Sequence, residues 1–152
     1  MQERIGNLLD EVTSGVILQV VNAQGAMNSG FAKQVRQKWP KVYSVYSDAI
    51  QPNLPDRGAS WLGTVIPVGV QNGLFVANLV AQQFYGSDGK RYLSYDALDT
   101  ALKKVAELNA LDKLEIHHPM IGCGLAGGSW DVVQQLIKQH LGNTNLWKIC
   151  HK

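Results

Sequence analysis

Residues 121–130 read Ile-Gly-Cys-Gly-Leu-Ala-Gly-Gly-Ser-Trp, and this stretch decides the fold. An apolar run typical of a strand, residues 114–116, precedes it, and a helical pattern over residues 129–140 follows. Glycines let the backbone turn with positive φ and approach a ligand closely. Free N–H groups and the dipole at a helix N-terminus then attract an anion. The order strand, glycine loop, helix predicts a phosphate-binding loop, although its spacing is neither the dinucleotide fingerprint nor the P-loop.

Another loop with the same context lies near the N-terminus. Residues 16–21 form a β-branched run that predicts a buried strand, and the loop Asn-Ala-Gln-Gly-Ala-Met-Asn-Ser-Gly follows at residues 22–30. Residues 31–39 then predict a helix, which Pro40 ends. If the two strands are neighbours, both loops meet at the carboxyl edge of the sheet, where ligands bind in open α/β sheets.

The remaining segments alternate between strand and helix patterns. Strands are predicted at residues 61–70 and 74–80, around an Asn72-Gly73 hairpin turn. A surface loop at 84–95 leads to a helix over 95–109, with Ser94 as its N-cap. Further elements are predicted at 115–119 (strand), 129–140 (helix) and 146–150 (strand). The alternation predicts an α/β fold, and the hairpin predicts a mixed sheet.

The composition is that of one compact domain, residues 1–152, with 45% apolar and 17% charged residues. The net charge is +2, and the basic residues are scattered, so nucleic-acid binding is the weaker interpretation. No apolar stretch reaches membrane-spanning length, and the N-terminus does not resemble a signal peptide. Two cysteines do not indicate a disulfide framework. We therefore expect a cytoplasmic protein that does not bind membranes.

Three motifs together resemble the macro domain family, the ADP-ribose-binding fold. They are Gly6-Asn7-Leu8-Leu9, residues 21–32 and residues 121–130, and the resemblance runs from about Gly6 to Ile149. It implies a three-layer α/β/α macro domain with a mixed central sheet. The branch that the chain resembles contains ADP-ribose-1″-phosphate phosphatases and the terminal ADP-ribose protein glycohydrolase, with members in phages and bacteria.

The resemblance also implies a set of ligand-binding residues. Asn7 stands where the family has an acidic residue that binds the adenine amino group, and Leu8 would offer a backbone N–H to the ring. The first loop, residues 22–30, would surround the distal ribose, and the second loop, residues 121–130, would clamp the diphosphate through backbone amides. The predicted ligand-binding residues are Asn7, Leu8, Gln19, Asn22, Ala23, Gly25, Met27, Gly30, Gly122, Cys123, Gly124, Leu125 and Ala126.

The catalytic groups of this branch have no clear counterparts in the chain. Gln19 stands where the phosphatases resembled here carry a His. The glycohydrolase uses a Lys where Gln82-Gln83 stands and an Asp where Ala126 stands. Glutamine serves neither as a general base nor as a nucleophile of that kind. The candidate catalytic residues are therefore Asn22, beside a terminal phosphate, and Asp131 as the acting group, with Asp10 as a further possibility.

Two functions follow from the resemblance. The first is a phosphatase or hydrolase acting on ADP-ribose 1″-phosphate or a related ADP-ribosyl derivative, which the activities of the resembled family members favour. The alternative is a non-catalytic binder that reads or sequesters ADP-ribose or another NAD-derived nucleotide, which the missing His, Lys and Asp favour. ADP-ribose or a derivative is the expected partner of a monomer. No cofactor is expected, and the adjacent His117 and His118 do not make a metal site.

Overall fold

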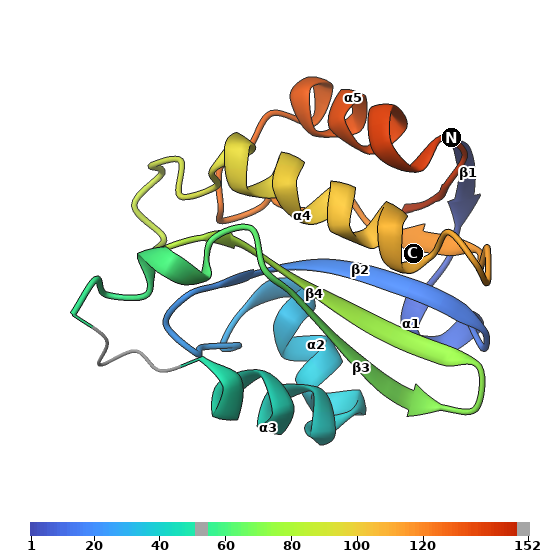
Figure 1. Cartoon of the computed structure of the whole chain (residues 1–152), viewed down its shortest axis with the longest axis horizontal. Helices are drawn as coiled ribbons and strands as arrows, with labels where there is room; N and C mark the ends of the chain where they lie inside the picture. The colour runs from blue at the N-terminus through green and yellow to red at the C-terminus, as the bar shows by residue number, and fades with distance from the viewer. Residues whose placement is uncertain (51–54, 149–152) are drawn as a thin grey trace.

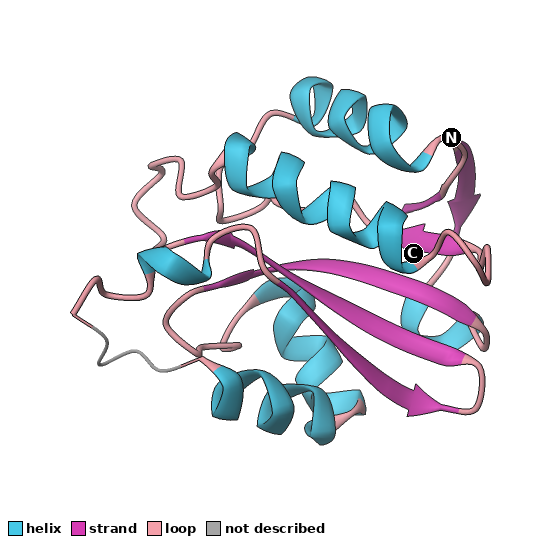
Figure 2. Cartoon of the chain, viewed as in Figure 1, coloured by secondary structure: helices cyan, strands magenta, loops and turns pink. Residues whose placement is uncertain are grey.

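A six-stranded sheet lies between two layers of helices (Figures 1 and 2). The computed structural model describes residues 1–50 and 55–148. The strands are β1 (Gln2–Ile5), β2 (Gly15–Asn22), β3 (Val65–Gln71), β4 (Leu74–Gln82), β5 (Ile116–His118) and β6 (Asn145–Lys148). Their order in the sheet is β1-β6-β5-β2-β4-β3, and β3–β4 is the antiparallel pair in an otherwise parallel set. The predicted three-layer α/β/α fold with a mixed sheet is confirmed.

The helices divide between the two faces of the sheet. In Figure 1, α4 and α5 lie above the sheet and α2 and α3 lie below it. The helices are α1 (Leu8–Glu11), α2 (Gly30–Lys38), α3 (Pro40–Ala49), α4 (Tyr95–Leu108) and α5 (Trp130–Leu141), with a 3₁₀ turn η1 (Ala59–Trp61). The Ser94 hydroxyl accepts a 3.1 Å bond from the Ala97 N–H, so the predicted cap of α4 is confirmed.

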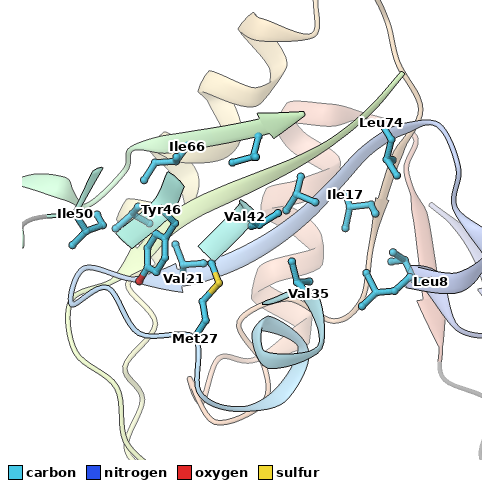
Figure 3. Close-up of a cluster of buried hydrophobic side chains, with 14 of the residues drawn as sticks. Leu8, Ile17, Val21, Met27, Val35, Val42, Tyr46, Ile50, Ile66 and Leu74 are labelled. Carbon is cyan, nitrogen blue, oxygen red and sulfur yellow. The ribbon is translucent and has the colours of Figure 1, made fainter. Parts of the chain in front are cut away.

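Alternate residues of β2 serve the two layers, as strand geometry requires. Ile17 and Val21 pack with α2 and α3, and these contacts form the core cluster drawn in Figure 3. Val16 and Leu18 point to the opposite side and pack with α4 and α5. Because β2 is buried on both faces and paired on both edges, the position of its carboxyl end is fixed by the whole core.

The structure differs from the sequence-based expectations in several places. The strand predicted from residue 61 begins at Val65, because η1 and Gly63 (φ +88°) interrupt the extended chain. Pro40 ends α2 and also begins α3, which was not predicted; its fixed φ suits the first position of a helix. β1 was not predicted because all four of its residues are exposed and give no apolar alternation. The predicted end of the last strand, at Cys150, lies outside the described residues.

Candidate ligand-binding site

A cavity of about 520 Å³ lies at the carboxyl ends of the central strands. β2 pairs with β4 on one side and with β5 on the other, so the segments that follow these strands meet at one edge. Both glycine-bearing loops line the cavity, and its volume lies in the usual range for small-molecule sites. The lining residues are Gln19–Asn22, Ala26–Ala32, Gln82, Tyr85–Ser87, Pro119–Gly122 and Gly124–Ala126.

The structure brings many of the predicted site residues together in this cavity and leaves others outside it. Those that line it are Gln19, Asn22, Met27, Gly30, Gly122, Gly124, Leu125 and Ala126. Those that do not are Asn7, Leu8, Ala23, Gly25, Cys123 and Asp131.

Four of the residues outside the lining have a clear local role or position. The Asn7 side chain accepts a 3.1 Å bond from the Leu9 N–H and caps α1, while Leu8 is buried in the core. Burial raises the pKa of the Cys123 thiol to about 11, so this thiol stays protonated at neutral pH and is a poor nucleophile. Asp131 lies exposed in the first turn of α5.

Asn22 organises the first loop through its side-chain amide. Its Oδ1 accepts bonds from the N–H groups of Gln24 (3.0 Å) and Ala26 (3.2 Å), and its Nδ2 donates a 2.9 Å bond to the Ala26 carbonyl. The loop therefore folds around Asn22, which sits at an irregularity in the β2–β4 register. Since both ends of the amide are engaged within the protein, the Asn22 side chain shapes the cavity wall.

Tyr46 of α3 fixes this arrangement from the core side. Its hydroxyl lies within hydrogen-bond distance of the Asn22 carbonyl and, at 2.9 Å, of the Asn22 Oδ1. Figure 3 shows the phenol reaching from α3 toward the segment that follows β2. Burial raises the pKa of Tyr46 far above its ordinary value, so the group remains a neutral donor. No motif pointed to Tyr46, because its partner is distant in the sequence and the contact depends on the packing of α3.

The second loop keeps its shape through backbone geometry. Gly122 (φ +71°) and Gly127 (φ +76°) adopt left-handed conformations that disfavour other residues. The Gly127 N–H donates to the Gly124 carbonyl (3.0 Å), and the Gly128 N–H donates to the Gly122 carbonyl (2.8 Å). In the described part of the chain, the N–H groups of Gly124, Leu125 and Ala126 donate no hydrogen bond. Three consecutive donors on residues that line the cavity are therefore available to a ligand.

The first turn of α2 supplies a second set of available donors. The first bond of the helix runs from the Lys33 N–H to the Ser29 carbonyl at 3.2 Å, and the Ser29 side chain does not cap the helix. The N–H groups of Gly30, Phe31 and Ala32 thus have no helical partner, and all three residues line the cavity. This helix end carries partial positive charge and favours anions.

The cavity is almost free of ionisable side chains. Among the described lining residues, Tyr85 carries the one ionisable side chain. Gln19, only 2% exposed, donates from Nε2 to the Asn78 Oδ1 at 2.6 Å, and Asn78 donates to the Ile66 carbonyl at 2.9 Å. This chain of bonds fixes the amide orientation and makes Gln19 part of the cavity wall. The site offers backbone donors to an anion but lacks a carboxylate, imidazole or amine for proton transfer among those lining residues.

Several lining residues were not among the predicted site residues. Gln82 and the segment 85–87 follow β4, and Met120 follows β5. The aromatic character of the loop after β4 was a signal for Tyr85, and the position of Met120 next to the second loop was a signal for that residue. Neither signal fixes which side of its loop faces the cavity.

The described residues offer neither a metal-binding cluster nor a membrane-spanning helix. They contain no group of three or more His, Cys, Asp or Glu side chains placed to hold a metal ion. No helix in residues 1–50 and 55–148 combines the length and apolar character needed to cross a membrane.

Solved structures of other proteins match nearly the whole chain. No family model matches the sequence. A protein of unknown function from Bacteroides thetaiotaomicron has a TM-score of 0.82 and 31% identity, and the match covers 98% of this chain and 97% of that one. A macrodomain protein from Streptomyces coelicolor has a TM-score of 0.75 and 29% identity over 99% of both chains.

Two matches with lower sequence identity are to proteins whose names state a ligand or an activity. Thermosipho africanus DarTG in complex with ADP-ribose has a TM-score of 0.72 and 17% identity, covering 98% of this chain and 42% of that one. The sequence is also 24% identical over 131 residues to the DNA ADP-ribosyl transferase–DNA ADP-ribosyl glycohydrolase fusion protein of the same species. That match covers 80% of this chain and 34% of the relative, so the chain spans about a third of the curated protein that it matches.

Proposed function

This chain belongs to the macro domain family, and from that premise we propose that it binds ADP-ribose, or a molecule carrying ADP-ribose, without turning it over. The supporting observation is the lining of the cavity. It combines two sets of unused backbone N–H groups with an almost complete lack of ionisable side chains among the described residues. Such a site suits the binding of a diphosphate and lacks the groups that hydrolysis needs.

In the proposed complex, the two donor sets contact the anionic part of the ligand. The diphosphate accepts hydrogen bonds from the N–H groups of residues 124–126, and the distal ribose lies against the first loop near Asn22 and Gly30. The start of α2 faces the same space and adds the positive end of its dipole. The uncharged wall formed by Val21, Phe31 and Met120 is left for the base.

A hydrolase is the second candidate, and the name of the curated relative, a glycohydrolase fusion protein, is what favours it. In this chain, Asn22 and Asp131 are the residues proposed for that role. The Asn22 amide is engaged in the first loop, and Asp131 is exposed outside the cavity lining. A hydrolase would therefore depend on positioning and on backbone donors more than on a side-chain acid or base.

Calorimetric titration with ADP-ribose, run beside an assay of phosphate released from ADP-ribose 1″-phosphate, separates the two candidates. We expect binding of ADP-ribose and no phosphate release above the rate without protein. A second assay follows release of ADP-ribose from an ADP-ribosylated oligonucleotide and is expected to give the same negative result. Turnover of either substrate would establish an enzyme, and activity unchanged in Asp131→Ala would then exclude Asp131 as the acting group. Absence of ADP-ribose binding would overturn the proposal.

A further inference from the structure

A second hollow, which we call the basic groove, lies beside the cavity on the α2–α3 side of the sheet. Its volume is about 570 Å³. It is lined by Met27, Asn28, Lys33, Arg36, Gln37, Pro40, Tyr43 and Ser44. Met27 and Asn28 line the cavity as well, so the first loop is the boundary between the two spaces.

The two spaces differ in charge. The described residues of the basic groove include the cations Lys33 and Arg36 and no carboxylate, whereas those of the cavity include no cation. On the neighbouring surface, Lys38 pairs with Asp10 at 3.8 Å, and Lys41 donates to the Gly69 carbonyl at 3.0 Å. Lys33 and Arg36 have no acidic partner among the ion pairs of the described residues.

Arg36 is held in place without being neutralised. Its guanidinium carbon lies 3.6 Å from the centroid of the Tyr43 ring, and Nη1 donates a 3.3 Å bond to the Asn28 Oδ1. Stacking on an aromatic ring and one hydrogen bond restrict the guanidinium while leaving donors free for a further acceptor. A planar fork fixed in this way is well suited to a phosphate group.

We infer that the basic groove binds a phosphate carried by the ligand beyond its distal ribose. This inference rests on the proposed function, which places the distal ribose against the first loop. A group attached to that ribose would cross the boundary at Asn28 and meet Arg36 and Lys33. The chemistry is that of a phosphate ester anion, and its source is either a second ADP-ribose unit or the backbone of a nucleic acid that carries the ADP-ribose.

The test compares three probes on the full chain. They are ADP-ribose, dimeric ADP-ribose, and a 5′-phosphorylated tetranucleotide added to protein saturated with ADP-ribose. We expect at least one extended probe to gain affinity from the groove, with a stronger dependence on salt than ADP-ribose shows. Arg36→Gln with Lys33→Gln should lower the affinity for that probe about tenfold and leave the affinity for ADP-ribose unchanged, since each solvent-accessible cation contributes about threefold.

A matched control removes the same charge elsewhere. Lys103 and Lys104 lie on the exposed side of α4, across the sheet from the groove. The double variant Lys103→Gln with Lys104→Gln should therefore leave all three affinities unchanged. A gain in affinity with dimeric ADP-ribose points to a second ADP-ribose unit as the source of the phosphate. A gain in affinity with the tetranucleotide points to nucleic acid. Binding of ADP-ribose with no gain from either extended probe would overturn this inference alone. Equal losses in the two double variants, or loss of ADP-ribose binding in the Arg36 and Lys33 variant, would also overturn it. Failure to bind ADP-ribose at all would overturn the proposed function with it.

Discussion

The two loops that line the cavity keep their shapes in different ways. In the first loop, side chains hold the backbone: Asn22 bonds three groups of the loop, and Tyr46 holds Asn22 from α3. In the second loop, glycines make the turns and the backbone bonds to itself, as from Gly127 to Gly124. The first loop thus depends on packing in the α2–α3 layer, and the second depends on conformations available mainly to glycine.

This difference predicts different responses to mutation and to acid. Substitution of Gly127 in the second loop should lower the stability of the fold, because the backbone of Lys90 and Arg91 encloses this glycine. Damage to the first loop by removal of a single hydroxyl should appear mainly in ligand affinity, because the apolar core around it remains. Four predictions test this contrast, beginning with the largest expected effect.

Gly127→Ala should lower the free energy of unfolding by about 3–4 kcal/mol, measured by urea denaturation. An added Cβ would lie 2.8 Å from the Lys90 carbonyl oxygen and 2.9 Å from the Arg91 Cα, in addition to the cost of a φ of +76°. Gly73→Ala is the matched control, because Gly73 has a φ of +78° and open space around it. It should cost about 1–2 kcal/mol from strain alone. Equal losses in the two variants would show that enclosure by the neighbouring backbone does not matter.

The end of β5, the strand that leads into the second loop, should be sensitive to acid. Burial lowers the pKa of His118, at the end of β5, from 6.5 to about 4, and the neutral ring contacts the Pro119 carbonyl and the Thr144 hydroxyl. The unfolded chain therefore binds a proton more readily than the folded chain below pH 6.5, so stability is lost as the pH falls toward 4. The loss from His118 should reach about 3 kcal/mol.

Urea denaturation across this pH range measures that loss, and the burial that lowers the pKa of His117 adds a loss of the same sign. In His118→Asn the decline should be shallower. An NMR titration of the His118 ring in the native chain gives an independent readout. A ring that titrates near 6.5 would contradict the prediction.

Gly124→Val should abolish most binding while the fold survives. Gly124 does not need a positive φ, and an added Cβ meets no atom within 4 Å. The valine would fill space in the cavity beside free N–H groups, so affinity for ADP-ribose should fall about 100-fold. The free energy of unfolding should change by less than about 0.5 kcal/mol. Normal affinity in the variant would place the ligand elsewhere, and Gly124→Ala should give an intermediate loss.

Tyr46→Phe should lower the affinity for ADP-ribose about tenfold and lower the free energy of unfolding by about 1 kcal/mol. The ring and its packing remain, and only the donor to Asn22 is lost. Tyr43→Phe on the same helix is the control and should change neither quantity, because the Tyr43 hydroxyl makes no hydrogen bond among those of the described residues. Calorimetry gives the affinity. A variant that is less stable but binds normally would show that Tyr46 only supports the fold.

The sequence predicts the parts of this site that depend on local patterns. The strand character of residues 16–21, the glycine loop after Ile121 and the Asn72-Gly73 turn lead to a mixed sheet with two loops at one edge. Local patterns do not reveal Tyr46, whose contact with Asn22 needs the unpredicted helix α3. The resemblance to the family, not a local pattern, places Asn7 in the site, and in the structure its side chain caps α1. Roles set by packing between distant segments cannot be predicted from spacing alone.

The convergence of the two loops on one ligand is tested most directly by an NMR titration with ADP-ribose that follows backbone amides. We predict that the amide signals of Gly30 and Gly124 shift together with a single affinity, while those of the α4 face stay in place. Shifts confined to one loop, or to neither, would contradict it.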